Sequence, residues 1–136
     1  MKKLLLSILA VFVAWQILDY LIHGVILMDA YESTKEMWRP MEEMSMPLMM
    51  LVSLLVAATF CYIYYAYISN KNLNTALKYS LVYGLGFGIS FGYGSYAAMP
   101  IPYYMAFVWF LGTVVEVVIA GLIIGLIITP QKTSEG

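Results

Sequence analysis

Charged side chains are scarce in this sequence. Asp, Glu, Lys and Arg together make up 11% of its 136 residues, whereas 62% of the residues are hydrophobic. A chain of this length cannot bury so much hydrocarbon in a core of its own, and a large apolar remainder would face water. The composition therefore excludes an ordinary soluble domain and predicts that residues 1–136 form a single transmembrane domain.

Several residue types that carry chemistry are also rare. The single cysteine, Cys61, excludes an internal disulfide framework and a CxxC metal or redox motif. The net charge is −1 and no basic cluster is present, so nucleic acid is not an expected partner. One histidine leaves no second ligand for a typical haem pair, and no nucleophile-and-base motif is visible. We expect a protein that is not an enzyme and needs no cofactor.

What the sequence does contain is four long apolar runs. Crossing a bilayer takes about 20 helical residues, and the runs cover residues 4–28, 47–69, 79–99 and 104–129. Lys2 and Lys3 precede the first run as in a signal peptide, but the run is longer than an h-region and lacks a small-x-small cleavage site. The sequence thus predicts an uncleaved anchor and an all-α, four-helix membrane bundle.

The basic residues predict an orientation. Lys35 and Arg39 fall on one side of the predicted spans, and five lysines fall on the other: Lys2, Lys3, Lys71, Lys78 and Lys132. Cytoplasmic loops carry the excess of Lys and Arg, so both termini are expected in the cytoplasm. The expected location is the inner membrane of a bacterium, with the lipid bilayer as the main partner.

The outer segment, residues 29–46, is the longest polar stretch. Ser33 and Glu36 match a capping box, so a short helix is expected to begin there and to stop before Pro40. Methionines and Trp38 give the segment an apolar side. It is therefore predicted to be amphipathic and to lie on the membrane surface.

Small residues recur at intervals of four in the last two predicted spans. The rows are Gly84, Gly88 and Gly92; Gly86, Ser90 and Gly94; and, in the fourth span, Gly121 and Gly125. This spacing lets two membrane helices approach closely. It favours a tightly packed bundle or a dimer seam, and the alternative is a flexible helix that moves during transport.

Ionisable residues inside a bilayer are costly and need a partner or water. Asp19, His23 and Glu116 lie within the predicted spans, and Gln16 shares one helix face with the first two because of the three- and four-residue spacing. The rise per residue puts Asp19 and Glu116 at nearly the same depth. Two carboxyls this close in an apolar layer are expected to hold at least one proton, which His23 can share.

Three interpretations of this polar cluster remain open. It can be a hydrogen-bonded knot that fixes helix register, or a proton relay or ion-coupling site. It can also be a metal site, since two carboxylates and one histidine can ligate zinc or iron.

Ten methionines are present, and nine fall near the predicted outer face. Thioethers suit Cu(I), so an outer-face copper site is one hypothesis, with the candidate ligands Met37, Met41, Met44, Met46 and His23. The favoured interpretation involves no metal, because methionine is a flexible filler for irregular apolar contacts.

Several stretches resemble a family of small four-span bacterial inner-membrane proteins that has no established activity. They are LDYLIHG in the first span, WRPMEEM in the outer segment, the glycine-rich third span, AAMPIP, and WFLGTVVEVVIAGLIIG in the fourth span. The resemblance implies the four-span layout and adds nothing catalytic.

The expected function is that of an accessory or structural subunit that packs against other membrane helices or against copies of itself. One alternative is a small proton- or cation-coupled transporter that uses Asp19, His23 and Glu116. The other alternative is the Cu(I)-binding protein described above.

Overall fold

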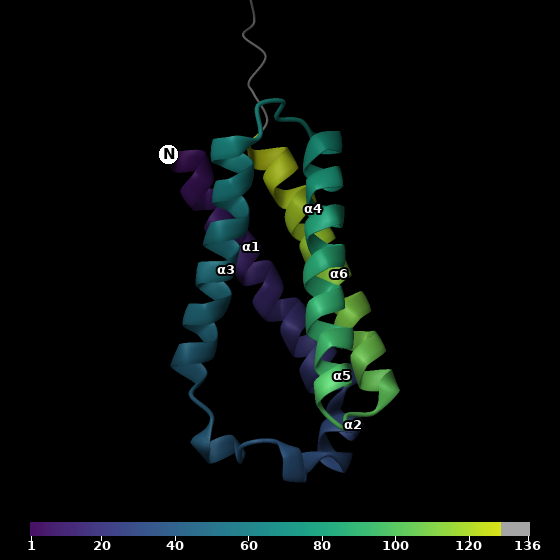
Figure 1. The fold of residues 1–136 in the computed structure, drawn as a ribbon. Coiled ribbons are helices and arrows are strands. Elements are labelled where there is room, and N and C mark those ends of the chain that lie inside the picture. The colour runs from purple at the N-terminus through teal and green to yellow at the C-terminus, as the bar shows by residue number, and fades with distance from the viewer. Residues whose placement is uncertain (129–136) are drawn as a thin grey trace, which may run out of the picture.

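The fold was analysed in a computed structural model, which describes residues 1–128. Within these residues the chain is helical and contains no β-strand (Figure 1). The last residue of the fourth predicted span, residue 129, and the predicted cytoplasmic Lys132 lie outside the described residues.

The elements follow one another with short connections. They are α1 (Lys2–Leu21), the π-helix η1 (Ile22–Ile26), α2 (Met28–Ser33), the 3-10 turns η2 (Lys35–Met37) and η3 (Met41–Glu43), α3 (Met46–Tyr67), α4 (Leu73–Gly88), the π-helix η4 (Ile89–Gly94), α5 (Ser95–Ala98) and α6 (Tyr103–Ile127).

Three helices in the described part of the chain are long and apolar enough to cross a membrane. They are Lys2–Ile26, which joins α1 to η1, together with α3 and α6. The structure therefore has the helices of a membrane protein. The third predicted span, 79–99, falls on α4, η4 and α5 and is not among these three.

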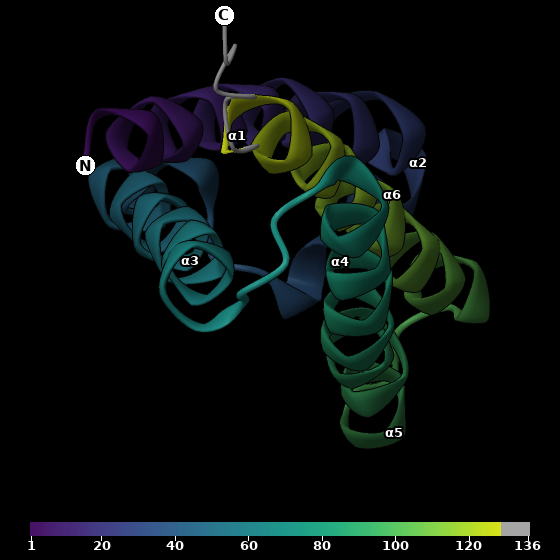
Figure 2. The ribbon, with the colours of Figure 1, turned by 90° about the horizontal axis from the view of Figure 1, so that it is seen from above.

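The long helices are arranged as an open bundle. α1 and α6 lie side by side, α4 packs along α6, and α3 packs on the first part of α1 (Figure 2). The N-terminus, the loop between α3 and α4, and the end of α6 lie at one end of the molecule, and the outer segment lies at the other (Figure 1). Toward the outer segment α3 leans away from α4, and residues 45–52 are all exposed (Figure 1).

Local sequence signals set where these helices begin. Pro47 lies in the first turn of α3, where its missing N–H costs nothing. The Asn72 side chain caps α4 by accepting a hydrogen bond from the Thr75 N–H at 2.9 Å. Pro102 is the N-cap of α6. The α3–α4 and α5–α6 connections are thus short and defined.

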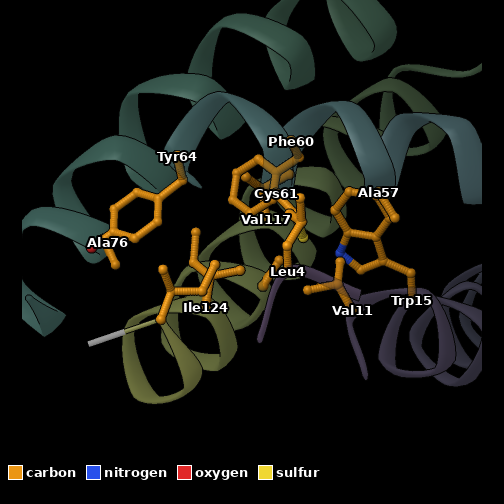
Figure 3. Packing of buried hydrophobic residues seen from close by; sticks show 12 residues of the cluster. Leu4, Val11, Trp15, Ala57, Phe60, Cys61, Tyr64, Ala76, Val117 and Ile124 are labelled. Carbon is orange, nitrogen blue, oxygen red and sulfur yellow. The ribbon is translucent and has the colours of Figure 1, made fainter. Parts of the chain in front are cut away.

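A cluster of apolar residues holds α1, α3, α4 and α6 together at the end that carries the N-terminus (Figure 3). Phe60 of α3 stacks on Tyr79 of α4 with ring centroids 4.9 Å apart, and Tyr79 donates a hydrogen bond to the Phe60 carbonyl at 2.9 Å. Cys61 is buried in this cluster. The contact between α3 and α4 is thus made by aromatic side chains at one end only.

The predicted glycine rows behave differently in the structure. The packed row (Gly84, Gly88 and Gly92) is buried against α6. A Cβ on Gly92 would lie 2.6 Å from the Ala106 carbonyl oxygen, and one on Gly88 would lie 2.9 Å from that of Phe110. On α6, Cβ atoms on Gly121 and Gly125 would meet Ser80 and Ala76 of α4. Glycine is needed here because the two backbones approach too closely for a side chain.

The open row (Gly86, Ser90 and Gly94) faces the outside of the bundle and is exposed. A Cβ on Gly86 would meet nothing within 4 Å, and one on Gly94 would meet only the Ile89 carbonyl oxygen, 3.9 Å away. Packing within the described chain therefore does not require small residues at these positions.

The outer segment differs from the prediction at its first turn. The predicted capping box at Ser33 and Glu36 is wrong, because Ser33 ends α2 and its hydroxyl donates to the Ala30 carbonyl at 2.9 Å. The hydroxyl thus bonds backward into the preceding turn, which Ser does readily at helix ends. The rest of the segment consists of the two 3-10 turns η2 and η3.

Candidate functional site

A partly open cavity of about 180 Å³ lies where α1, η1, α4, η4 and α6 meet. We call it the acidic cavity, and it is lined by Asp19, Ile22, His23, Phe87, Phe91, Trp109, Thr113 and Glu116. The structure thus brings three of the four residues of the predicted polar cluster to one place. Half of the eight lining side chains are polar or ionisable, which is unusual for a site within apolar helices.

Asp19 and Glu116 form an acidic pair at this cavity. The two carboxyl groups interact directly, and the Glu116 Oε1 is buried without a hydrogen-bond partner among the described residues. The Trp15 indole N–H donates to the Glu116 backbone carbonyl at 2.9 Å, which fixes α1 against α6 beside the pair. A buried oxygen without a partner is costly, so a ligand, a proton or water at this atom would satisfy it.

His23 is held between the acidic pair and the outer segment. Its Nε2 lies 3.9 Å from Asp19 Oδ1, and its Nδ1 lies 2.7 Å from the Tyr31 hydroxyl. The Trp109 indole N–H donates to the same hydroxyl at 3.0 Å. The Tyr31 hydroxyl can therefore donate a hydrogen bond to His23 Nδ1. In that arrangement the imidazole proton is on Nε2, facing Asp19.

Tyr31 of the outer segment lies beside the cavity and is hydrogen-bonded to two of its lining residues, His23 and Trp109. Burial raises the pKa of Tyr31 above its ordinary value, the hydrogen bond from Trp109 lowers it, and the Asp19 charge raises it further. The net direction is upward, so the hydroxyl keeps its proton and remains a donor to His23 at neutral pH. Trp38 packs edge-on against both Tyr31 and Trp109, which ties the outer segment to this wall.

Aromatic rings make up another part of the cavity lining. Phe91 stacks on Trp109 with centroids 4.8 Å apart and an interplanar angle of 18°. Phe87 lies one helical turn before Phe91, so both rings line the same cavity. The acidic pair and three aromatic side chains therefore line one small space.

Both π-helical segments border this cavity. η1 contributes Ile22 and His23, and η4 contributes Phe91. Single π-turns inside α-helices are uncommon and occur often at functional sites. Nothing in the residue spacing predicted them, because the extra residue in a π-turn leaves no simple periodic pattern.

The other predicted site residues lie elsewhere. Gln16 does not line the cavity; its Nε2 donates to the Ser53 hydroxyl at 3.0 Å and joins α1 to α3. Met37 is partly buried against the apolar cluster around Leu27 and Trp109, whereas Met41 and Met46 are exposed by 79% and 56%. Met44 is half-buried.

This geometry gives little support to the hypotheses that the protein binds a metal ion. Among residues 1–128 no group of three or more His, Cys, Asp or Glu side chains is placed to hold a metal ion. The zinc or iron hypothesis for Asp19, His23 and Glu116 therefore lacks its ligand arrangement. The copper hypothesis remains a prediction, with Nδ1 of His23 already engaged by Tyr31.

Comparison with known proteins adds no assignment. No protein-family model, curated protein or solved structure matches this chain. The resemblance to four-span bacterial membrane proteins therefore stays a prediction, and function has to be argued from the cavity itself.

Sequence reasoning missed Phe87, Phe91, Trp109 and Thr113. One signal was available, since Trp109, Thr113 and Glu116 are spaced four and three apart and share a face of α6. The two phenylalanines carried no such signal, because their place in the wall depends on how α4 crosses α6.

Proposed function

We propose that this chain is a four-span membrane protein that binds a cation, a proton included, at the acidic pair and couples it to movement across the bilayer. The observation that supports the proposal is the cavity at Asp19 and Glu116. A purely structural hydrogen-bond network would be closed to solvent, and each of its polar atoms would have a hydrogen-bond partner. Here the pair borders a partly open cavity, and Glu116 Oε1 has no hydrogen-bond partner among residues 1–128.

In the proposed topology, α4, η4 and α5 together form the third span. They run without a break in helical structure beside α6 from one end of the bundle to the other (Figure 1). Both termini are proposed to be cytoplasmic, in a bacterial inner membrane. Lys2, Lys3 and Lys71 lie at one end of the bundle, and Lys35 and Arg39 lie in the outer segment at the other, which agrees with the charge rule (Figure 1).

The lining residues suit an exchange of protons. Asp19 and Glu116 cannot both carry a charge at close range in a low dielectric without strong repulsion, so one proton is shared by the pair. A cation that enters the cavity supplies the compensating charge and allows that proton to leave. His23 faces Asp19 and offers a second place for the proton.

Proton flux in vesicles tests this proposal. Protein is reconstituted into liposomes that contain a pH-sensitive dye, and a potassium diffusion potential, negative inside, draws protons inward. We expect wild type to acidify the interior faster than empty liposomes, and Glu116→Gln to fall to the rate of empty liposomes. The matched control is Glu36→Gln, in the outer segment, which should retain the wild-type rate. Flux that is equal in wild type and Glu116→Gln would refute the role of the pair.

A second candidate function is that of an accessory subunit which packs against other membrane helices or a second copy. The open row favours it, because Gly86, Ser90 and Gly94 present a flat helix face that the described chain does not use. This face is on the same helix as the packed row, so the helix is suited to close contacts on two sides.

Oligomeric state in a mild detergent tests the second candidate. We expect wild type to sediment as a dimer or with a co-purifying partner, and Gly86→Leu combined with Gly94→Leu to sediment as a monomer, because the leucines prevent close approach. The control is Val52→Leu, at an exposed position on α3 and away from the open row, which should behave as wild type. A lone wild-type monomer would count against this function and would leave the cation proposal unaffected.

A further inference from the structure

We infer that the ligand of the acidic cavity is a small organic ammonium ion, held between the carboxyls of Asp19 and Glu116 and the rings of Phe87, Phe91 and Trp109. This inference rests on the proposed cation-binding role of the same cavity. It goes beyond that role because it names the chemical class of the cation.

The composition of the walls is the first argument. A bare metal ion needs several oxygen, nitrogen or sulfur ligands, and the described residues offer no such group here. Three of the eight lining residues are aromatic. Aromatic faces are attracted to cations and, together with carboxylates, form the usual recognition site for alkylammonium groups.

Size is the second argument. The cavity holds about 180 Å³, and an engineered cavity of about 150 Å³ is large enough for a benzene molecule. A proton or a dehydrated alkali ion would leave most of this space empty. A trimethylammonium or similar group fills it and brings its methyl groups against the rings.

The route of access is the third argument. The side chains of Asp19 and His23 are 43% and 35% exposed, and Phe87 and Phe91 are exposed by 46% and 39%. These values place the opening between the helix that carries Asp19 and His23 and the helix that carries Phe87 and Phe91. On the side of the outer segment, Tyr31 is bonded to the lining residues His23 and Trp109. An organic cation with apolar substituents can therefore enter from the membrane side, where a strongly hydrated metal ion is poorly soluble.

Choline is a suitable probe, because its quaternary charge does not change with pH. Its neutral carbon isostere, 3,3-dimethylbutan-1-ol, has nearly the same shape without the charge. The titratable groups that face the site are Asp19 and His23 from α1 and η1 and Glu116 from α6, while α4 and η4 contribute only Phe87 and Phe91. Any pH dependence of choline binding therefore belongs to the first three residues.

The experiment is calorimetric titration of the protein in lipid nanodiscs with choline and with the isostere. We expect saturable binding of choline only, with about one proton released for each choline bound because the ammonium charge replaces the shared proton. Glu116→Gln should weaken binding by about tenfold or more. Phe87→Leu and Phe91→Leu should each weaken it by about twofold to fivefold, because leucine keeps the apolar contact and removes the aromatic face.

Phe107→Leu is the matched control, since this phenylalanine is on α6 but exposed and outside the cavity; it should bind choline as wild type does. If Glu116→Gln fails to fold, the two phenylalanine variants still test the ammonium assignment. Three results would each overturn the ammonium assignment. The isostere could bind as tightly as choline, potassium ions could displace choline at concentrations similar to that of choline, or both phenylalanine variants could bind choline with unchanged affinity. Proton flux that persists without choline binding would refute this inference alone, whereas choline binding without flux would refute coupled transport alone.

Discussion

Gly88→Ala combined with Gly92→Ala is expected to destabilise the protein by about 2–6 kcal/mol. Each new Cβ would lie within 2.9 Å of a backbone carbonyl oxygen of α6. Backbone atoms cannot rotate away as a side chain can, so the two helices have to separate over this stretch. Because whole domains are stable by only about 5–15 kcal/mol, we expect the double variant to unfold at a much lower denaturant concentration or temperature in detergent.

The open row supplies the matched control on the same helix. Gly86→Ala combined with Gly94→Ala adds the same two methyl groups where nothing closer than 3.9 Å receives them. Alanine favours a helix over glycine by about 1 kcal/mol per residue, so this variant should be as stable as wild type or more stable. Equal effects of the two double variants on unfolding would contradict the packing of α4 on α6.

The packed row also positions the acidic cavity. Gly92 lets η4 approach Ala106 and Phe110 of α6, and this approach carries Phe91 onto Trp109. A loss of contact between these helices would move the aromatic side chains of α4 and η4 away while leaving Asp19 on α1 and His23 on η1 in place. The packed row and the acidic cavity therefore both depend on the same close contact between η4 and α6.

The helices were predictable from the sequence because apolar length alone defines a membrane helix. The run at 4–28 agrees closely with Lys2–Ile26, and the run at 47–69 with α3. The third run was less well defined by composition, since its glycines lower its hydropathy. The capping box at Ser33 failed for a different reason, because a local bond to the Ala30 carbonyl competed with the predicted cap.

The candidate site was predictable only in part. The free-energy cost of placing an ionisable group in a bilayer identified Asp19, His23 and Glu116, because such groups are rare within apolar helices. Spacing along α1 also suggested Gln16, but its side chain turns to Ser53 of α3, which helical periodicity cannot reveal. The aromatic wall and the role of Tyr31 depend on contacts between α4, α6 and the outer segment. Such contacts between distant segments are not encoded in any local pattern.

The central claim is that Asp19 and Glu116 share a proton that exchanges with solvent through an open cavity. A sealed structural pair would share a proton as well, so the presence of a protonated carboxyl group does not decide between the two. Exchange does decide, because a cavity lined by both carboxyl side chains gives water and ligands a route to the pair, whereas a sealed pair has none.

Infrared spectroscopy of the protein in a bilayer measures this directly. We predict a carbonyl stretching band from a protonated carboxyl group in wild type at neutral pH, a prompt shift of that band after transfer to deuterated water, and complete loss of the band in Glu116→Gln. Glu36→Gln should leave this protonated-carboxyl band unchanged. A band that fails to shift in deuterated water, or that survives in Glu116→Gln, would contradict the account.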